Sequence, residues 1–241
     1  MPEQWYTGVV TKIVNETYNT RRFWIHIPEK EAFHFKAGQF VTLDLPIHEK
    51  KNKRWRSYSI ASHPNGSSEI ELVIVLLDGG AGTTYIFNEI REGSELILRG
   101  PLGNFVLPEA MDRDLFLICT GTGIAPFRSM AKFLHKNQLA HPNIHLIYGS
   151  RYEKDILYKD EMRALAAEMP GFHYHPTLSR EDSPDWTGHR GYVHNVYEDL
   201  LSDRRPAHFF LCGWKVMIDE AKQRIQAMGY DRHDIHLELY G

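Results

Sequence analysis

Cysteine is scarce in this chain: Cys119 and Cys212 are the only two among its 241 residues. Two thiols cannot build a disulfide framework or a CxxC metal site, and an iron–sulfur cluster needs four. A reducing, cytoplasmic setting fits this cysteine usage. The fourteen histidines are scattered and include no HExxH motif; the closest pairs are His173 with His175 and His233 with His236. We interpret the histidines as surface or interface residues, and no metal site is predicted.

Long apolar runs and an excess of basic residues are also absent. The formal net charge is -3, which argues against a nucleic-acid partner, because binding nucleic acid usually needs a basic face. The N-terminus has no apolar signal core, and no segment approaches the length of a membrane span. With 42% hydrophobic and 24% charged residues, the composition is that of a globular protein, and the length suggests one large or two small domains.

The first 110 residues carry six short β-rich segments separated by turn signals, a pattern typical of a closed antiparallel barrel. The segments lie at 5–10, 22–27, 38–45, 55–62, 70–77 and 95–105. One helix near 85–90 interrupts them, because Ile86, Phe87 and Ile90 share a helical face. The charged stretch 48–54 has no apolar period. We interpret it as a solvated loop, with docking of an acidic partner as the alternative.

The segment 55–62 places a cation, a phenol and several hydroxyl groups on one strand. Arg56 and Tyr58 share one face of that strand, and Ser57 and Ser59 share the other. Arginine can bind a phosphate, tyrosine can lie along an aromatic ring, and serine can hydrogen-bond to a ring heteroatom. Taken alone, the segment fits an edge strand with a polar outer face better than a ligand site. The downstream motifs reverse that preference.

A glycine-rich turn at 78–84 precedes the predicted helix. The backbone N–H groups at a helix start lie at the positive end of the helix dipole and suit a diphosphate. Thr83 would equally suit simple N-capping of the helix. Because the turn and the strand 55–62 belong to the same predicted barrel, we favour the diphosphate.

Near residue 110 the pattern changes to strands that alternate with helices. Apolar strands are predicted at 114–119, 145–151, 172–178, 208–213 and 235–240, with helices after 126, at about 158–169 and through 217–225. This order predicts a parallel, doubly wound α/β sheet. Ligands of such sheets bind beyond the carboxyl ends of the strands.

Several motifs fall at that expected edge of the sheet. The strand 114–119 leads into the turn Gly121-Thr122-Gly123 and then into a helix with Pro126 in its first turn, which is a pattern for binding a nucleotide phosphate. Pro126 replaces the third glycine of the common dinucleotide fingerprint. The other motifs at the edge are Ser150-Arg151, Ser179-Arg180 and Cys212-Gly213.

Three arginines, Arg151, Arg180 and Arg190, bear on the choice of nucleotide. Each alone is more often a solvated surface residue, but Arg151 and Arg180 directly follow strands and should gather at one edge. A cluster of guanidinium groups favours an extra phosphate, and so NADPH over NADH. No acidic residue stands at the tip of the strand that ends at 148–150, where a ribose hydroxyl would be held.

Along nearly the whole chain, and in the same order, these motifs resemble those of the ferredoxin–NADP+ reductase superfamily. The run 56–59 resembles its RxYS flavin motif, and 80–83 resembles its pyrophosphate turn. The run 121–126 resembles its GTGxAP loop, and 212–213 resembles its CG motif. The resemblance implies two domains: an antiparallel β-barrel at 1–110 that binds FAD, and an α/β doubly wound parallel sheet at 111–241 that binds NADP(H).

The resemblance also implies roles for individual residues. Arg56 would contact the FAD phosphates, Tyr58 would pack on the isoalloxazine, and Ser59 would lie near its N5 atom. The catalytic residues would be Tyr58, Ser59, Cys212 and Tyr240, although Tyr240 equally suits a plain tail, since Gly241 follows it. The cofactor-binding residues would be Arg56, Ser57, Tyr58, Ser59, Val73, Val75, Gly80, Gly82, Thr83, Thr84, Gly121, Thr122, Gly123, Pro126, Ser150, Arg151, Ser179, Arg180, Arg190, Cys212 and Gly213.

The implied activity is hydride exchange between NADP(H) and FAD, coupled to single-electron exchange with a separate ferredoxin or flavodoxin. One alternative is an NADH-dependent reductase of a cytochrome or an oxygenase, and another is a free-flavin or ferric reductase. A third is a flavin-binding electron-relay subunit without nicotinamide turnover. The sequence leaves the electron partner and the direction of electron flow open.

Overall fold

The computed structural model describes residues 4–239, which form two compact units. The first unit comprises the described residues up to Leu107 together with Arg128–Phe133, and the second comprises Pro108–Phe127 and the residues from Leu134 onward. The sequence places the domain boundary between 110 and 111, close to the junction of Leu107 and Pro108. As a functional boundary it stays a prediction.

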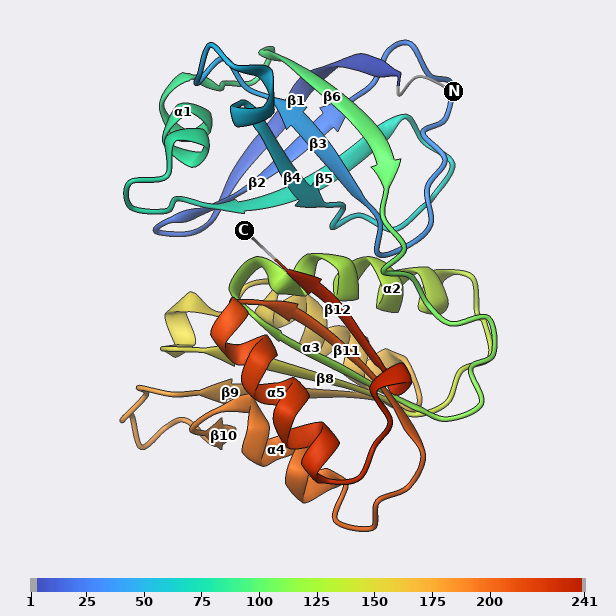
Figure 1. Cartoon of the computed structure of the whole chain (residues 1–241). Helices are drawn as coiled ribbons and strands as arrows, with labels where there is room; N and C mark the ends of the chain where they lie inside the picture. Colours follow the sequence, from blue (N-terminus) through green and yellow to red (C-terminus); the bar gives the residue numbers. More distant parts are fainter. Residues whose placement is uncertain (1–3, 240–241) are drawn as a thin grey trace. The chain divides into compact units, whose positions relative to one another are not determined.

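The first unit is built on a six-stranded antiparallel sheet (Figure 1). Its strands are β1 (Trp5–Thr17), β2 (Thr20–His26), β3 (Phe40–Asp44), β4 (Trp55–Ser59), β5 (Glu69–Val75) and β6 (Glu95–Leu102), in the order β4-β3-β6-β1-β2-β5. Just beyond the end of β4, Ile60 bridges Leu72 of β5 and so brings the two edge strands together. The predicted antiparallel β architecture is confirmed.

The core of the first unit follows from the alternation of side chains along its strands. Ile70, Leu72 and Ile74 of β5 belong to the core, so the odd-numbered residues of this strand face the other way. The helix α1 (Ala81–Glu89) adds Ile86 and Phe87 to the same core. The helix is therefore held by its apolar face, which leaves its first turn to other contacts.

The second unit contains a six-stranded parallel sheet with helices on both faces (Figure 1). Its strands are β7 (Asp114–Thr120), β8 (Ile144–Ser150), β9 (Phe172–Leu178), β10 (His189–Arg190), β11 (Ala207–Gly213) and β12 (Ile235–Leu239). Its helices are α3 (Lys159–Glu168), α4 (Val193–Leu200) and α5 (Lys215–Ala227). The helix α2 (Ile124–Lys136) contributes its two ends to this unit, because its middle residues, Arg128–Phe133, belong to the first unit. The predicted doubly wound α/β sheet is confirmed.

The strand order β10-β9-β8-β7-β11-β12 places β7 and β11 side by side at the centre of the sheet. After β7 the chain adds β8 and β9 on one side of β7, and it returns later to place β11 on the other side. The carboxyl ends of β7 and β11 therefore lie at a topological switch point, the usual ligand site of open α/β sheets.

Sequence patterns did not predict two elements, β10 and α4. The strand β10 has only two residues, too few for any alternation to be visible. Tyr192 precedes α4 and supplies no side-chain cap, so the usual start signal is missing. The helix is held instead by Val193, Val196 and Tyr197, which are buried against the sheet.

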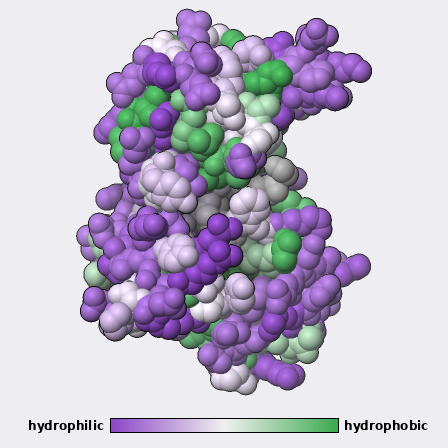
Figure 2. Space-filling view, turned by 90° about the vertical axis from the view of Figure 1, so that its left-hand side faces the viewer, coloured by the Kyte–Doolittle hydropathy of each residue, from purple (hydrophilic) through white to green (hydrophobic). Residues whose placement is uncertain are grey.

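Short 3-10 turns complete the described structure: η1 (Lys51–Lys53), η2 (Gly121–Gly123), η3 (Glu153–Asp155) and η4 (Arg232–Asp234). The charged stretch that the sequence interprets as a solvated loop contains η1, whose three residues are all exposed. The face in Figure 2 is largely hydrophilic, with hydrophobic residues in small separate groups. Within residues 4–239, no helix is both long enough and apolar enough to cross a membrane.

Candidate functional site

Strand β4 carries the Arg-Ser-Tyr-Ser run and pairs with β3 along its whole length. Tyr58 packs against the core of the first unit, and burial raises the pKa of its phenol to about 12, with Arg56 acting in the opposite direction. The phenol is therefore protonated throughout the neutral range. Its ring can form a flat contact surface and its hydroxyl can donate a hydrogen bond, but a phenol that stays protonated cannot act as a general base.

The guanidinium-bearing side chain of Arg56 lies against the start of α1. A Cβ atom placed on Gly82 would stand 3.0 Å from Cγ and 3.1 Å from Nε of Arg56. Arg56 also donates from Nη1 to the carbonyl oxygens of Lys53 and Trp55, at 3.1 and 2.8 Å. The structure thus brings together the arginine and the glycine turn, two features that lie 26 positions apart in the sequence.

The first turn of α1 is not capped by a side chain at its N-cap, Gly80. The hydroxyl of Thr83 is turned back into the turn, where it donates to the Gly80 carbonyl and accepts from the backbone N–H of Leu77, both at 3.1 Å. The buried Thr83 therefore stabilises the turn that precedes the helix and does not act as a simple N-cap. Thr84 is exposed. An uncapped helix start beside a guanidinium fits a diphosphate group.

The remaining residues predicted to bind FAD lie on β4 and β5. Ser57 is exposed, and its hydroxyl is 3.0 Å from that of Thr42 on β3, whereas Ser59 is buried. Val73 is buried and Val75 is half-buried, and both lie on the side of β5 that faces away from the core cluster. Their contacts with a flavin stay predictions.

A buried ion pair supports the chain just after β4. Glu71 accepts from Arg128 Nη1 at 2.8 Å and from Arg22 Nε at 2.6 Å, and the side chains of Glu71 and Arg128 are each only 4% exposed. Arg128 Nη1 also donates to the carbonyl oxygen of Ala61 at 2.7 Å, and Ser129 Oγ donates to that of Ser62 at 2.6 Å. All of these residues belong to the first unit. Sequence reasoning missed this group, because its members carry no local motif.

In the second unit, the two predicted glycine motifs meet at the ends of β7 and β11. A Cβ on Gly123 would stand 2.4 Å from the carbonyl oxygen of Cys212, and one on Gly213 would stand 2.5 Å from Oγ1 of Thr120. Both positions exclude a side chain, and Gly121 (φ +54°) and Gly213 (φ +134°) adopt backbone angles that favour glycine. The turn η2 continues directly into α2, with Pro126 in the first helical turn, as the sequence predicts.

The two cysteines are direct neighbours in the register of β7 and β11. Both are completely buried, and burial, followed by the proximity of Cys212, raises the pKa of the Cys119 thiol. A completely buried thiol is inert as a nucleophile, because neither solvent nor substrate reaches it. Cys212 is accordingly suited to shaping the site, as the resemblance implies, and its contact with a nicotinamide stays a prediction.

The loops after β8 and β9 are joined by backbone hydrogen bonds. Ser179 N donates to the carbonyl oxygen of Ser150, and Arg180 N donates to that of Arg151, both at 3.0 Å. The hydroxyl of Ser179 also donates to the Ser150 carbonyl at 3.3 Å. The structure therefore brings these two predicted pairs side by side, with their arginines in register.

Arg190 has a different environment from the other two arginines. Its guanidinium donates to the carbonyl oxygens of Glu181, of Ser183 at 2.6 Å and of Trp186 at 3.3 Å. These bonds hold the loop between β9 and β10 in place, and they occupy donors that a phosphate would need. Its proposed contact with a 2′-phosphate stays a prediction, and the hydrogen bonds supply a structural role that the sequence did not reveal.

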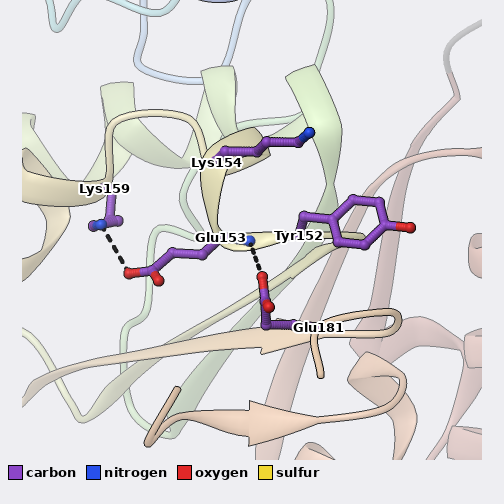
Figure 3. Close-up of a pocket in the computed structure, with 5 residues that line it drawn as sticks. All are labelled: Tyr152, Glu153, Lys154, Lys159 and Glu181. Carbon is purple, nitrogen blue, oxygen red and sulfur yellow. Dashed lines mark hydrogen bonds and ion pairs between the residues drawn. The ribbon is translucent and has the colours of Figure 1, made fainter. Parts of the chain in front are cut away.

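A shallow pocket lies next to Arg151 in sequence (Figure 3). It is lined by Tyr152, Glu153, Lys154, Lys159 and Glu181. Lys159 Nζ pairs with Glu153 Oε1 at 2.9 Å, and Glu153 N donates to Glu181 Oε2 at 3.1 Å. Hydrogen bonds from the backbones of Glu153 and Ser183 lower the pKa of the Glu181 carboxyl. Sequence reasoning missed this pocket, because its residues come from two separate segments of the chain and share no local motif.

Two further predictions concern features without described contacts. Tyr240, the candidate for stacking on the flavin, lies outside the described residues. Within residues 4–239, no group of three or more His, Cys, Asp or Glu side chains is arranged to hold a metal ion.

Comparisons with known proteins match both units. Residues 7–107 match the family model of the oxidoreductase FAD-binding domain, and residues 117–223 match that of the oxidoreductase NAD-binding domain. These domains define a flavoprotein oxidoreductase that uses FAD and a nicotinamide dinucleotide, which confirms the predicted cofactors at that level. The chain is 36% identical over 219 residues to ferredoxin–NADP reductase B of Sorangium cellulosum, covering 87% of each chain. It belongs to the ferredoxin–NADP+ reductase superfamily.

Other similar proteins are reductase components of oxygenases. The chain is 31% identical to a glycine betaine monooxygenase reductase subunit of Pseudomonas aeruginosa, covering 95% of this chain but 63% of that protein. It thus spans less than two thirds of this relative. It is 30% identical to the phenol 2-monooxygenase reductase component DmpP of Pseudomonas sp., over 99% of this chain and 66% of that protein.

Solved structures agree on the fold. The crystal structure of the Amycolatopsis cytochrome P450 reductase GcoB has a TM-score of 0.88 at 26% identity, and covers 99% of this chain and 70% of that one. A ferredoxin NADP+ reductase from Neisseria gonorrhoeae, solved with bound FAD and NADP, has a TM-score of 0.82 at 24% identity over 98% of this chain and 99% of that one. At that identity the second likeness bears on the fold alone.

Proposed function

We propose that this protein is a ferredoxin–NADP+ reductase-type enzyme that exchanges a hydride with NADPH and single electrons with a ferredoxin or flavodoxin. The observation that carries the choice of NADPH is the pairing of the loops after β8 and β9, which puts Arg151 and Arg180 in register at one sheet edge. From two neighbouring backbone positions, both guanidinium groups could reach one 2′-phosphate, the group that distinguishes NADPH from NADH. The similarity to the Sorangium ferredoxin–NADP reductase supports the same assignment.

In the first unit, the fit to FAD rests on the cradle between Arg56 and the uncapped start of α1. The lack of a Cβ at Gly82 leaves room for Arg56 beside the helix start, so a diphosphate there would receive backbone N–H groups and a guanidinium. Tyr58, whose hydroxyl stays protonated, would pack its ring on the isoalloxazine. FAD, when bound, supplies both hydride transfer and single-electron transfer, which is the chemistry this reaction requires.

In the second unit, the switch point would receive the dinucleotide. Gly121–Gly123 open the start of α2 to a phosphate, and the buried Cys212 with Gly213 fixes the backbone opposite. No group of the protein has to move a proton in the hydride step. The residues contribute position and electrostatics.

A second candidate function is an NADH-dependent reductase of an oxygenase or cytochrome. The observation that favours it is the pair of carboxylates, Glu153 and Glu181, in the pocket whose lining begins at Tyr152, the residue after Arg151. A carboxylate near the coenzyme's ribose can bind its hydroxyl group and repel a phosphate. Relatives that are reductase components of oxygenases share 30–31% identity with the chain. The two candidates differ in coenzyme, so a direct comparison separates them.

The experiment compares the rates of NADPH and NADH oxidation by the wild type and by Arg151→Ala and Arg180→Ala, with ferredoxin, flavodoxin and a cytochrome as acceptors. Each lost charge-assisted bond is worth about 1.5–3 kcal/mol, so kcat/KM for NADPH should fall about tenfold or more, with little change for NADH. Arg224→Ala is the control, because the side chain of Arg224 is 42% exposed on α5 and pairs there with Glu198 and Glu220. Equal losses with both coenzymes, or a wild type that prefers NADH, would reject the NADPH assignment.

A further inference from the structure

Trp214 is the one exposed tryptophan of the described chain. It is 61% exposed, whereas the other four tryptophans are buried or half-buried. It directly follows β11, at the switch point of the sheet. A large aromatic side chain left in water at a ligand-binding edge is a candidate for contact with a ring of the ligand.

The backbone around Trp214 is fixed on both sides. Its N–H donates to Oγ1 of Thr120 at 3.3 Å, and Gly213, the residue before it, packs too closely on Thr120 to tolerate a Cβ. The helix α5 begins at the next residue, Lys215. The indole is therefore exposed while its main chain is anchored, which lowers the entropic cost of using it as a contact surface.

The indole also borders the glycine turn of the neighbouring strand. A Cβ on Gly121 would stand 3.9 Å from Nε1 of Trp214. The side chain that is absent at Gly121 thus leaves an open surface next to an N–H donor and an aromatic face. No element of the sequence motif predicts this position, because the tryptophan follows the Cys-Gly pair rather than forming part of it.

We propose that Trp214 binds the nicotinamide ring of the coenzyme through its indole face. The inference rests on the dinucleotide use proposed above and identifies a residue that sets which redox form binds better. An oxidised nicotinamide ring carries a positive charge, whereas the reduced ring is neutral. Because indole faces attract cations, Trp214 should strengthen the binding of the oxidised coenzyme more than that of the reduced one.

The test measures equilibrium binding to the FAD-loaded protein with three ligands: NADP+, its neutral and unreactive tetrahydro analogue, and 2′-phospho-ADP-ribose, which lacks the nicotinamide. NAD+ and ADP-ribose form a parallel pair in case NADH is the preferred coenzyme. Trp214→Ala should weaken the oxidised dinucleotide about threefold to tenfold, the tetrahydro analogue less, and the nicotinamide-free fragment less than about twofold. Trp214→Phe should recover most of the loss. Val216→Ala, at a position that is 78% exposed on the first turn of α5, is the control and should change nothing.

The outcomes separate this proposal from the proposed function. If the wild type binds the dinucleotides and Trp214→Ala binds all ligands as well as the wild type does, the Trp214 proposal is wrong and the function stands. Equal weakening of the dinucleotide and the fragment also overturns it, since the effect would then not involve the nicotinamide. Unchanged binding with slower electron delivery to the acceptor in both Trp214→Ala and Val216→Ala would overturn it in favour of partner docking. A wild type that binds no dinucleotide would remove the proposed function and this inference together.

Discussion

Replacing Arg128 by methionine should destabilise the first unit, because it breaks a buried ion pair. The guanidinium bonds to Glu71 and to the Ala61 carbonyl, both below 3 Å, and both charged side chains are 4% exposed. Removing one partner of such a pair typically costs about 3–5 kcal/mol, since the other charge stays buried. Arg22 remains bonded to Glu71, so we expect a loss near the lower end, about 3 kcal/mol.

The assay is urea unfolding of the FAD-loaded protein, followed by flavin release and by tryptophan fluorescence. Arg224→Met is the matched control: Arg224 also pairs with two glutamates, Glu198 and Glu220, but its side chain is 42% exposed. Exposed pairs contribute at most about 1 kcal/mol, so this variant should stay within that limit.

A double-mutant cycle gives the sharper result. Arg128→Met combined with Glu71→Gln removes both buried charges, so the double variant should lose less stability than the sum of the single variants, by about 1 kcal/mol or more. Additive losses, or a loss below about 1 kcal/mol for Arg128→Met alone, would refute the reasoning that burial makes this pair matter.

Three further predictions concern other parts of the chain. Gly123→Ala should abolish dinucleotide binding or destabilise the second unit, because its Cβ would stand 2.4 Å from a backbone carbonyl oxygen; full binding and stability would contradict the close packing. Gly82→Ala should displace Arg56 and weaken FAD retention in gel filtration, while circular dichroism stays unchanged. Burial lowers the pKa of His145 and of His175 to about 4, below the unfolded value near 6.5. The stability that these neutral rings contribute is thus complete above about pH 6.5 and is lost as the pH falls toward 4. Replacing both histidines by glutamine should reduce the fall of the urea unfolding midpoint between about pH 6.5 and pH 4. A fall as steep as that of the wild type would reject the assignment.

The sequence predicted the elements of the site better than their surroundings. The Arg-Ser-Tyr-Ser strand, the glycine turn before α1 and the two glycine motifs of the second unit are local patterns. Strand periodicity placed the first of them on a strand and the others at or just after the ends of strands, as the structure has them. The expectation that Arg56 and the glycine turn share one diphosphate site followed from the predicted barrel. The close approach of Gly123 to Cys212, and the pairing of β7 with β11 that causes it, came from the structure.

The contacts that the sequence could not predict join residues without a shared pattern. Arg128 and Glu71 are 57 positions apart, and each alone reads as a surface charge on its own element. The three carbonyl contacts of Arg190 depend on the path of an irregular loop. Trp214 was overlooked because an exposed aromatic side chain is visible only once burial is known.

Anaerobic mixing of the purified protein with a stoichiometric amount of NADPH, and separately of NADH, tests the central claim most directly. The protein should retain yellow FAD through gel filtration, and its oxidised-flavin absorbance should bleach with NADPH much faster than with NADH; added ferredoxin or flavodoxin should then restore it. A preparation that holds no FAD and cannot be reconstituted with it, or one whose flavin neither coenzyme bleaches, would contradict the account.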